Sequence, residues 1–488
     1  MLEDKQHGRL ERRLAEEQQT FARPLRSLLR RGAVTCTSER TLAQVAAIMR
    51  SEEVGSVVVV DSRAQPIGVL TSHDMVRAAA EGALERPAAE IMSRDPLALP
   101  AHALAYEAAV AMTGRRIRHV LVMDEGRLIG VVSERDLFSL QRLGLGEITM
   151  ELRLAADIGA LAGLAAEIRK LTGLLVEQGV APEQLTLFVS VLNDRLGQRV
   201  LEIARKRFDL ERISWCWLAF GSEGRVEQTF ATDQDNGLIF AAHDGAPATA
   251  VRERLLPYAR EVNDGLAACG FPLCRGNVMA SNPALCLSAE EWQARMAGWL
   301  ANTDPQALLD CSICFDFRAL AGDARLAEQL RAWLLPRARA RPGFLRLMAE
   351  NAMSARPPRG MLRHFATQDA PNAPHTMDLK MFGVRPFVDA ARIYALAHGL
   401  PQTSTVERLR AAAAAKALGE PDVSAWVRAF GFIQGLRLRM QAKSRSGDVS
   451  GANRIDPYAL DEFEQRTLKE ALRQASKLQD RLRLDYQL

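Results

Sequence analysis

An internal repeat near the amino terminus constrains the fold of this chain more than any other feature of its sequence. Residues 54–77 and residues 117–138 each contain an apolar segment, an acidic turn and a second apolar segment that includes a glycine. Both copies then follow one pattern of glycine, hydroxyl residue and aspartate: Gly68, Thr71 and Asp74 in the first, Gly130, Ser133 and Asp136 in the second. An upstream segment of each copy has apolar residues at helical spacing. The sequence therefore predicts two β-α-β-β-α units that pack as a pair.

This repeat resembles a tandem CBS (cystathionine-β-synthase-type) domain pair and covers about residues 22–142. In that family the cleft between the two repeats often binds adenine nucleotides. The resemblance implies that Asp74 and Asp136 contact the ribose hydroxyls and that Thr71 and Ser133 lie near the phosphates. A Ser or Thr followed three residues later by an acidic residue also caps helices, so a structural role for these residues stays open.

The length of 488 residues exceeds the roughly 250–300 residues at which one hydrophobic core stops growing, so several domains are expected. Lys and Arg number 63 against 59 Asp and Glu, and this small excess does not indicate a nucleic-acid partner. No run of about 18 apolar residues predicts a membrane span. Residues 1–21 form a charged, helical segment without an apolar signal core, and the seven cysteines are sparse, so we expect a cytoplasmic protein.

Helical periodicity indicates a connector over residues 143–208. Apolar residues recur at helical spacing from Ile158 to Leu175, Gly179 and Pro182 end that helix, and a second helix runs from about Pro182 to Arg207. From residue 336 to residue 488 the chain is predicted to be a helical domain, and its last helix spans Leu460 to Leu484.

Between these helical regions, residues 209–335 contain the pattern that indicates chemistry. An apolar strand, Ser214–Phe220, ends at a Gly221-Ser222 turn, and Asp233 and Asp235 lead into a second apolar strand. A turn that begins with Gly-Ser lets backbone N–H groups approach phosphate oxygens. Two aspartates at i and i+2 of an extended segment project to one face, where they can share a divalent cation such as Mg²⁺. A surface Asx-turn remains the alternative explanation of the two aspartates.

Here the sequence resembles the DNA polymerase β-type nucleotidyltransferase superfamily. It resembles more closely a bacterial signal-transduction family that joins CBS pairs to a nucleotidyltransferase related to protein-PII uridylyltransferase. The resemblance implies a mixed α/β catalytic domain in which Gly221, Ser222 and Arg225 bind the nucleotide. It implies Mg²⁺ as the cofactor and UTP or ATP as the substrate. An N-terminal cyclic-nucleotide-binding domain, often found in that family, is not recognisable in this sequence.

The superfamily normally has a third metal-binding carboxylate, for which Asp316 is the candidate. It lies in the apolar, strand-like run from Ser312 to Arg318, where a charge must be paired or metal-bound. Pairing with Arg318 on the same strand face is the structural alternative. Cys311, directly before this run, and Cys314 within it would face opposite sides of a strand, which argues against a shared metal.

Two further segments resemble that family. The loop from Cys274 to Asn282 suggests a constrained turn near the nucleotide. In the segment from Asp378 to Arg392, three basic residues are candidates to face a triphosphate: Lys380, Arg385 and Arg392. A structural pairing of Lys380 with Asp389 is an equally open alternative.

The sequence therefore predicts a multidomain chain with a CBS pair, a helical connector, a polymerase-β-like domain and a helical bundle. The function it favours is regulatory transfer of UMP or AMP to a hydroxyl of a PII-like or other regulatory protein, in a homodimer controlled by adenine nucleotide. The alternative is an adenylate sensor whose transferase fold does not catalyse. A phosphohydrolase of the HD type, suggested by His243 and Asp244, is disfavoured because the chain has only eight histidines, which are scattered.

Overall fold

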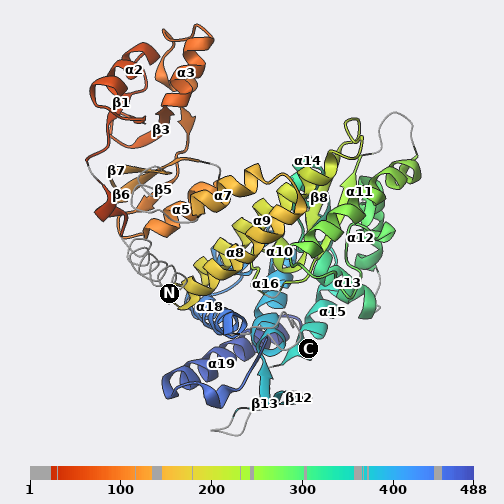
Figure 1. Cartoon of the computed structure of the whole chain (residues 1–488). Coiled ribbons are helices and arrows are strands. Elements are labelled where there is room, and N and C mark those ends of the chain that lie inside the picture. Colours follow the sequence, from red (N-terminus) through yellow and green to blue (C-terminus); the bar gives the residue numbers. More distant parts are fainter. Residues whose placement is uncertain are drawn as a thin grey trace, which may run out of the picture. The chain divides into compact units, whose positions relative to one another are not determined.

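The computed structural model describes residues 24–29, 31–115, 117–134, 145–177, 180–230, 232–241, 247–301, 305–356, 365, 368–370, 373–443 and 453–488. The chain divides into two compact units, Met1–Met150 and Glu151–Leu488 (Figure 1). The predicted helix over residues 1–21 lies outside the described residues. The general prediction of a multidomain chain with mixed α/β and helical parts is confirmed.

The first repeat of the amino-terminal unit has the predicted order of elements. These are β1 (Thr35–Thr37), α2 (Leu42–Ser51), β2 (Ser56–Val60), β3 (Pro66–Thr71) and α3 (Ser72–Ala80). β2 pairs in parallel with β1 and antiparallel with β3, and β4 (Ser93–Arg94) extends the sheet beyond β3. Leu42, Val45 and Met49 lie on one face of α2 and pack in the same buried cluster as Val57 and Val59 of β2.

The second repeat follows the same plan as far as the structure describes it. Its elements are β5 (Ala98–Pro100), α5 (Ala105–Arg115), β6 (His119–Asp124) and β7 (Arg127–Ser133), and its sheet has the order β5-β6-β7. Two short helices, η1 (Leu25–Leu28) and α4 (Ala88–Ile91), complete this unit, and α7 (Leu145–Leu154) runs across its boundary. Residues 135–144, where the last predicted helix of the repeat would lie, are outside the described part.

The carboxy-terminal unit begins with the two predicted helices, α8 (Ile158–Glu177) and α9 (Pro182–Arg205). They pack against each other (Figure 1). A four-stranded sheet follows, made of β8 (Trp215–Ala219), β9 (Asn236–Phe240), β10 (Cys286–Ser288) and β11 (Arg318–Gly322). Its order is β10-β9-β8-β11, and every residue of β8 and β9 is buried, as expected for central strands covered on both faces.

Helices connect and cover these strands. They are α10 (Gly221–Gly224), α11 (Ala248–Ala268), η2 (Pro283–Leu285), α12 (Ala289–Ala301), α13 (Pro305–Cys314) and α14 (Ala324–Arg339). The prediction of a strand over residues 312–318 is wrong except at Arg318, where β11 begins. Helix α13 continues to Cys314, and Cys311 and Cys314 are both buried on it. Asp316 lies in the short connection between α13 and β11. Apolar residues alone did not distinguish a buried helix end from a strand.

The remainder is mainly helical, with α15 (Pro342–Ala352), η3 (Met353–Ala355), α16 (Arg385–His398), α17 (Thr405–Ala414), α18 (Glu420–Lys443), η5 (Pro457–Ala459) and α19 (Glu462–Asp485). The last helix agrees with its prediction. A small sheet was not predicted: β12 (Gln368–Ala370), β13 (Ala373–Asp378) and β14 (Arg454–Ile455). A π-helix, η4 (Lys380–Val384), leads directly into α16.

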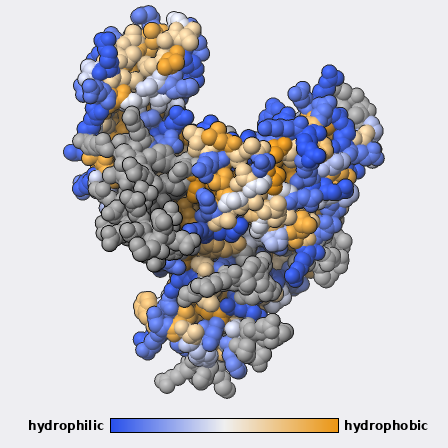
Figure 2. Space-filling model, viewed as in Figure 1, coloured by the Kyte–Doolittle hydropathy of each residue, from blue (hydrophilic) through white to orange (hydrophobic). Residues whose placement is uncertain are grey.

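Helix α16 is the central helix of this region. All residues from Pro386 to Leu396 are buried, including the charged residues Asp389 and Arg392. Figure 2 shows hydrophilic and hydrophobic residues interspersed over the visible surface. Among the described residues, no helix is both long enough and apolar enough to cross a membrane.

Candidate functional site

The turn after β8 depends on two glycines that a larger residue could not replace. Gly221 has a φ of 54°, in the left-handed region that glycine adopts without strain. A Cβ atom on Gly221 would lie 2.7 Å from Oδ2 of Asp235, and one on Gly224 would lie 1.7 Å from the backbone oxygen of Asp316. The turn therefore lies against both segments that carry the predicted carboxylates. Ser222 lies between these glycines and is half-buried.

Asp233 and Asp235 lie immediately before β9 and share one side of the extended chain. A carboxylate oxygen from each aspartate and the sulfur of Cys274 lie within 4.8 Å of one another. The backbone N–H of Phe220 donates to the carbonyl oxygen of Asp235 at 2.8 Å, which joins the segment to the end of β8. The structure therefore brings the two predicted aspartates together beside Gly221.

Asp233 and Asp235 lie close enough for their negative charges to repel each other. Burial, and after it the negative charge of Asp233, raise the pKa of Asp235 to about 6. A hydrogen bond from the Cys274 thiol and the positive charges of Lys380 and Arg225 act in the opposite direction. Such repulsion between carboxylates is what a bound divalent cation relieves.

Amide side chains between and behind the aspartates fix this segment, a role that the sequence interpretation missed. Gln234 points inward and donates to the carbonyl oxygens of Asn263 and Phe271, at 2.9 Å each. Asn263 in turn donates to Gln234 and Asn236. The polar residues that alternate with the aspartates were the available signal, since alternate positions of an extended chain face opposite sides.

The same amide network holds the loop that was predicted to be a constrained turn. The backbone N–H of Ala280 donates to the Asn236 side chain at 2.8 Å, and that of Ser281 donates to the Asn263 side chain at 3.1 Å. Asn277 has a φ of 54°. Cys274 brings the start of the loop to Asp235, so the loop is constrained and borders the aspartate pair.

These residues fit a magnesium ion. Mg²⁺ binds carboxylate oxygens and commonly keeps only one or two of them, with substrate phosphates and water as the remaining ligands. Asp233 and Asp235 supply two carboxylates. Burial raises the pKa of the Cys274 thiol, which donates its hydrogen bond to Asp235 and is too soft a ligand for Mg²⁺.

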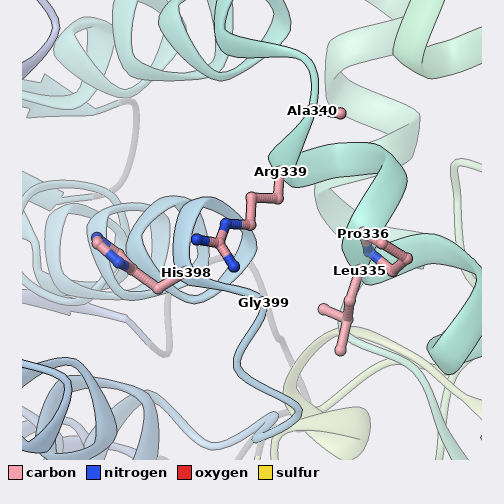
Figure 3. Close-up of a pocket in the computed structure, with 6 residues that line it drawn as sticks. All are labelled: Leu335, Pro336, Arg339, Ala340, His398 and Gly399. Carbon is pink, nitrogen blue, oxygen red and sulfur yellow. The ribbon is translucent and has the colours of Figure 1, made fainter.

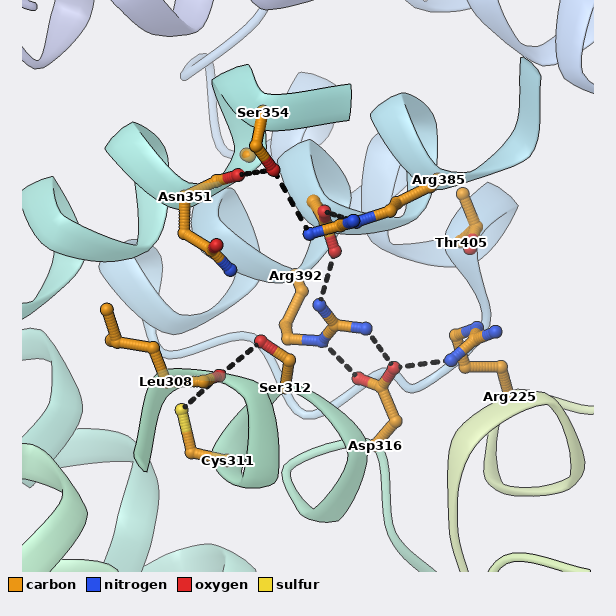
Figure 4. Close-up of polar contacts among 12 residues, drawn as sticks. Arg225, Leu308, Cys311, Ser312, Asp316, Asn351, Ser354, Arg385, Arg392 and Thr405 are labelled. Carbon is orange, nitrogen blue, oxygen red and sulfur yellow. Dashed lines mark hydrogen bonds and ion pairs between the residues drawn. The ribbon is translucent and has the colours of Figure 1, made fainter. Parts of the chain in front are cut away.

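Asp316, the predicted third carboxylate, does not join the aspartate pair. Among the described residues, the group that could hold a metal contains Asp233, Asp235 and Cys274 but not Asp316. The fully buried Asp316 carboxylate instead accepts hydrogen bonds from three arginines, two of which Figure 4 shows. The distances are 2.7 Å from Arg225, 3.0 and 2.7 Å from Arg392, and 2.5 Å from Arg408. The predicted metal role of Asp316 is therefore corrected to that of the central anion of an arginine cluster.

This cluster determines the charge of Asp316. Burial alone would raise the pKa of its carboxyl, but Arg392, Arg408 and Arg225 together lower that pKa far below its ordinary value. The predicted alternative partner, Arg318, is also not involved. Arg318 binds Asp194 at 2.7 Å and the carbonyl oxygen of Glu223 at 2.9 Å.

Arg225, predicted to bind the nucleotide, forms two ion pairs within the protein. Its guanidinium pairs with Asp316 at 2.7 Å and with Glu227 at 3.0 Å. Glu227 also accepts hydrogen bonds from the backbone and hydroxyl of Thr405, at 2.6 and 3.1 Å. Arg225 therefore attaches the Gly221–Gly224 turn to the helical region through its Nε and Nη1 atoms.

The three basic residues near the start of α16 have different environments. Arg392 is buried and bonds to Asp316 and Asp389. Arg385 bonds to Asp389 at 3.2 Å and to Ser354 at 3.5 Å (Figure 4). Lys380 is exposed and lies near enough to Asp235 to lower its pKa. The pairing of Lys380 with Asp389 is not observed, because Asp389 binds the two arginines.

In the amino-terminal unit, Thr71 and Asp74 form a capping box at the start of α3. The Thr71 hydroxyl donates to Asp74 at 2.7 Å, and the backbone N–H of Thr71 donates to the same carboxylate at 2.9 Å. Arg77 contacts the other oxygen of Asp74. The helix-capping role that the sequence left open is therefore observed for Thr71 and Asp74. Ser133 ends β7, and Asp136, like His243 and Asp244, lies outside the described residues.

A separate cavity of about 500 Å³ lies at the carboxy-terminal ends of α14 and α16 (Figure 3). Leu335, Pro336, Arg339, Ala340, His398 and Gly399 line it. It contains none of the predicted site residues.

A Gly-Ser turn beside two aspartates that directly precede a central strand is the arrangement that the resemblance to nucleotidyltransferases predicted. Three protein-family models match the chain accordingly. Residues 166–306 match the family described as "Putative nucleotidyltransferase DUF294", residues 342–486 match "Putative nucleotidyltransferase substrate binding domain", and residues 25–81 and 88–142 match "CBS domain". The chain therefore contains a CBS domain pair, a DUF294 domain and the substrate-binding domain that accompanies it. The DUF294 match begins inside the predicted connector, and Asp316 lies beyond its end.

Curated relatives match only part of the chain. An uncharacterized 17.7 kDa protein of Acidianus ambivalens is 32% identical over 98 residues, which are 20% of this chain and 60% of the relative. An uncharacterized protein of Methanopyrus kandleri is 30% identical over 128 residues, which are 25% of this chain and 65% of the relative. The chain thus spans less than two thirds of the length of these two relatives.

Two solved structures are similar to a quarter of the chain. A CBS domain protein from Pyrobaculum aerophilum complexed with AMP is 29% identical, with a TM-score of 0.24, over 26% of this chain and 99% of that chain. A CBS-domain containing protein from Agrobacterium tumefaciens is 27% identical, with a TM-score of 0.24, over 25% of this chain and 96% of that chain.

Proposed function

We propose that this protein is a regulatory nucleotidyltransferase that transfers UMP or AMP from a nucleoside triphosphate to a hydroxyl group of an acceptor protein. One observation carries the proposal. Asp233 and Asp235 converge beside the Gly221 turn, with carboxylate oxygens within 4.8 Å of each other. The matches to a nucleotidyltransferase family and to its substrate-binding domain support the same class of reaction.

The residues have separate roles in the proposed reaction. Asp233 and Asp235 would hold Mg²⁺, which would neutralise phosphate charge and orient the triphosphate. Gly221 and Ser222 lie against the nucleotide, since the absence of a Cβ at Gly221 leaves its backbone accessible. The acceptor oxygen forms a bond to the α-phosphorus as the bond to the β-phosphate breaks, so that pyrophosphate leaves and the hydroxyl proton is released. Asp316 takes no part in metal binding and positions the turn through Arg225.

We further propose that adenine nucleotide binds the CBS pair and controls this activity. The matched CBS models and the resemblance of the repeats support a ligand site formed by Thr71, Asp74, Ser133 and Asp136. The resemblance also supports a homodimer in the cytoplasm, a PII-like protein as acceptor, and neither nucleic acid nor membrane as partner.

One observation favours a second candidate, a nucleotide sensor without transferase activity. The only third carboxylate that the sequence suggested, Asp316, is enclosed by arginines and is unavailable to a metal or to an acceptor hydroxyl. A site with two carboxylates would still bind a magnesium–nucleotide complex.

Incubation of the protein with α-³²P-labelled UTP or ATP, Mg²⁺ and a cell lysate separates these candidates. A transferase labels an acceptor protein, and Asp233→Asn or Asp235→Asn removes the label while leaving the fold unchanged. Saturable nucleotide binding without labelling, in several lysates and with both nucleotides, would support the sensor. Labelling by both aspartate variants at the wild-type rate would refute the site.

A further inference from the structure

Two side chains with nitrogen donors line the cavity at the carboxy-terminal ends of α14 and α16. Arg339 belongs to the last turn of α14 and His398 to the last turn of α16, and these two helices pack against each other. In Figure 3 the Arg339 side chain extends toward the end of α16 that carries His398. Both residues are exposed, so a ligand can reach them from solvent.

Neither of these side chains has a partner within the part of the chain that the structure describes. No hydrogen bond or ion pair joins the side chain of Arg339 or His398 to another described residue. An arginine presents five N–H donors and an imidazole at least one. The remaining lining residues have no polar side chain: Leu335, Pro336, Ala340 and Gly399. The cavity wall therefore offers side-chain donors without side-chain acceptors.

Arg339 and His398 are not required to cap the two helices. Basic side chains near a helix carboxy terminus often serve the free carbonyl groups there. Here Gly399 adopts the left-handed conformation of a helix cap, with a φ of 67°, and its N–H donates to the carbonyl oxygen of Leu396 at 3.3 Å. At the end of α14, the N–H of Ala340 donates to the carbonyl oxygen of Pro336 at 3.1 Å. Backbone contacts thus close both helix ends.

The two chain segments that form the cavity contain no carboxylate. Residues 329–349, which include the end of α14, contain five arginines and neither Asp nor Glu. Residues 390–406, which include the end of α16, also contain neither. Positive charges that face one site repel each other, and a bound anion relieves this repulsion. The composition of both segments therefore favours a negatively charged ligand.

We propose that this cavity binds a small organic anion. Its phosphate or carboxylate group would contact Arg339 and His398, and its apolar part would pack against Leu335 and Pro336. A guanidinium group matches the geometry of either oxyanion with two parallel hydrogen bonds. A volume of about 500 Å³ lies within the range of small-molecule sites. Because neither aspartate of the proposed metal site lines the cavity, this inference is independent of the proposed function.

Isothermal titration of the full chain in the absence of Mg²⁺ with four probes tests the site. Phenyl phosphate and benzoate each combine an oxyanion with an apolar ring, whereas inorganic phosphate lacks the ring and benzyl alcohol lacks the charge. We expect phenyl phosphate or benzoate to bind most tightly, and the tighter of the two identifies the oxyanion. Arg339→Ala should weaken that binding by about 10- to 100-fold, the range for a hydrogen bond to a charged group. Arg339→Lys should retain only part of the affinity, because lysine lacks the planar pair of donors.

Arg337→Ala is the matched control. Arg337 is an exposed arginine of the same helix, but its guanidinium lies 4.3 Å from the centre of the Trp333 ring and it does not line the cavity. This variant should bind the probes as the wild type does. Arg339→Ala should melt at the wild-type temperature, since Arg339 is exposed and makes no ion pair within the described ranges.

Three results would overturn the proposal. An equal loss of binding in Arg337→Ala and Arg339→Ala would show a general attraction to the basic segment instead of a site in the cavity. Wild-type affinity in both Arg339→Ala and His398→Ala would place the bound probe elsewhere. Tightest binding by inorganic phosphate or benzyl alcohol, or no binding of phenyl phosphate and benzoate by the wild type, would exclude an organic anion as the ligand.

Discussion

Arg392 donates two hydrogen bonds to Asp316, at 3.0 and 2.7 Å, although the two residues are 76 positions apart in the chain. Both side chains are buried, with exposed fractions of 4% and 0%. Arg408 and Arg225 bind the same carboxylate. One aspartate thus joins the nucleotidyltransferase turn to two helices of the substrate-binding domain.

Replacement of the central anion should destabilise the protein strongly. Asp316→Asn leaves three buried guanidinium groups without their shared charge partner, and removal of one member of a buried ion pair typically costs about 3–5 kcal/mol. Urea unfolding followed by circular dichroism measures this loss. Glu462→Gln is the control, because its salt bridge to Arg466 is highly exposed and should contribute little. Equal stability of the wild type and Asp316→Asn would show that the cluster is not a determinant of stability.

Gly221→Ala should impair nucleotide binding and lower stability. The added Cβ would meet Asp235 at 2.7 Å, and a φ of 54° is strained for alanine. Gly298→Ala is a matched substitution in α12, where no atom lies within 4 Å of the added Cβ, and it should be neutral or stabilise by up to about 1 kcal/mol. Thermal melting and titration with Mg–UTP distinguish the two. Tight nucleotide binding by Gly221→Ala would contradict the placement of the turn against the ligand.

Magnesium-dependent nucleotide binding should increase as pH rises through about 6. The pKa of Asp235 is raised from 3.8 to about 6 by burial and by Asp233, and the ionised carboxylate is the ligand. Folding stability of the metal-free protein should depend on pH in the opposite direction. The contribution of Asp235 to the free energy of unfolding is complete below pH 3.8 and is lost as pH rises through 6. Asp235→Asn should remove the pH dependence of both nucleotide affinity and stability, and it should lower the rate of nucleotidyl transfer by roughly 10²–10³-fold. Titrations and melting curves from pH 5 to pH 8 would test this, and a pH-independent affinity in the wild type would oppose it.

Glu223, in the same turn, should be protonated at neutral pH. Burial, and after it the negative charge of Asp194, raise its pKa to about 8. Since the folded-state pKa lies above the ordinary value of 4.5, the stabilising contribution is complete below 4.5 and is lost as pH rises through 8. Glu223→Gln should therefore match the wild type near pH 4 and exceed its melting temperature increasingly as pH rises to 9. If the difference in melting temperature between the two proteins stayed constant with pH, the raised pKa of Glu223 would be excluded.

Thr71→Ala should destabilise the CBS pair by about 1 kcal/mol through loss of the helix cap. Thr71→Ser keeps the hydroxyl and should retain most of the stability. Differential scanning calorimetry gives the stabilities, and AMP titration of both variants tests the proposed ligand role. If AMP affinity falls in Thr71→Ala but not in Thr71→Ser, the hydroxyl serves the ligand as well as the cap.

Much of the site was predictable because its parts lie close together in the chain. Helices α8, α9 and α19 follow from the 3.6-residue spacing of their apolar side chains. Asp233 and Asp235 share a side because they are two positions apart in an extended segment. By contrast, residues 312–318 were assigned to one strand, since a short apolar run does not distinguish a helix end from a strand.

The sequence by itself determined the repeat, the order of the main elements and the convergence of two aspartates beside a glycine turn, since all of these arise from local spacing. Only the tertiary structure decided the role of Asp316. A buried carboxylate requires a partner, but sequence spacing does not identify a partner from another part of the chain. The three arginines that bind it lie 76, 91 and 92 residues away, and two of them, Arg392 and Arg408, meet it only when α16 and α17 pack against the nucleotidyltransferase domain.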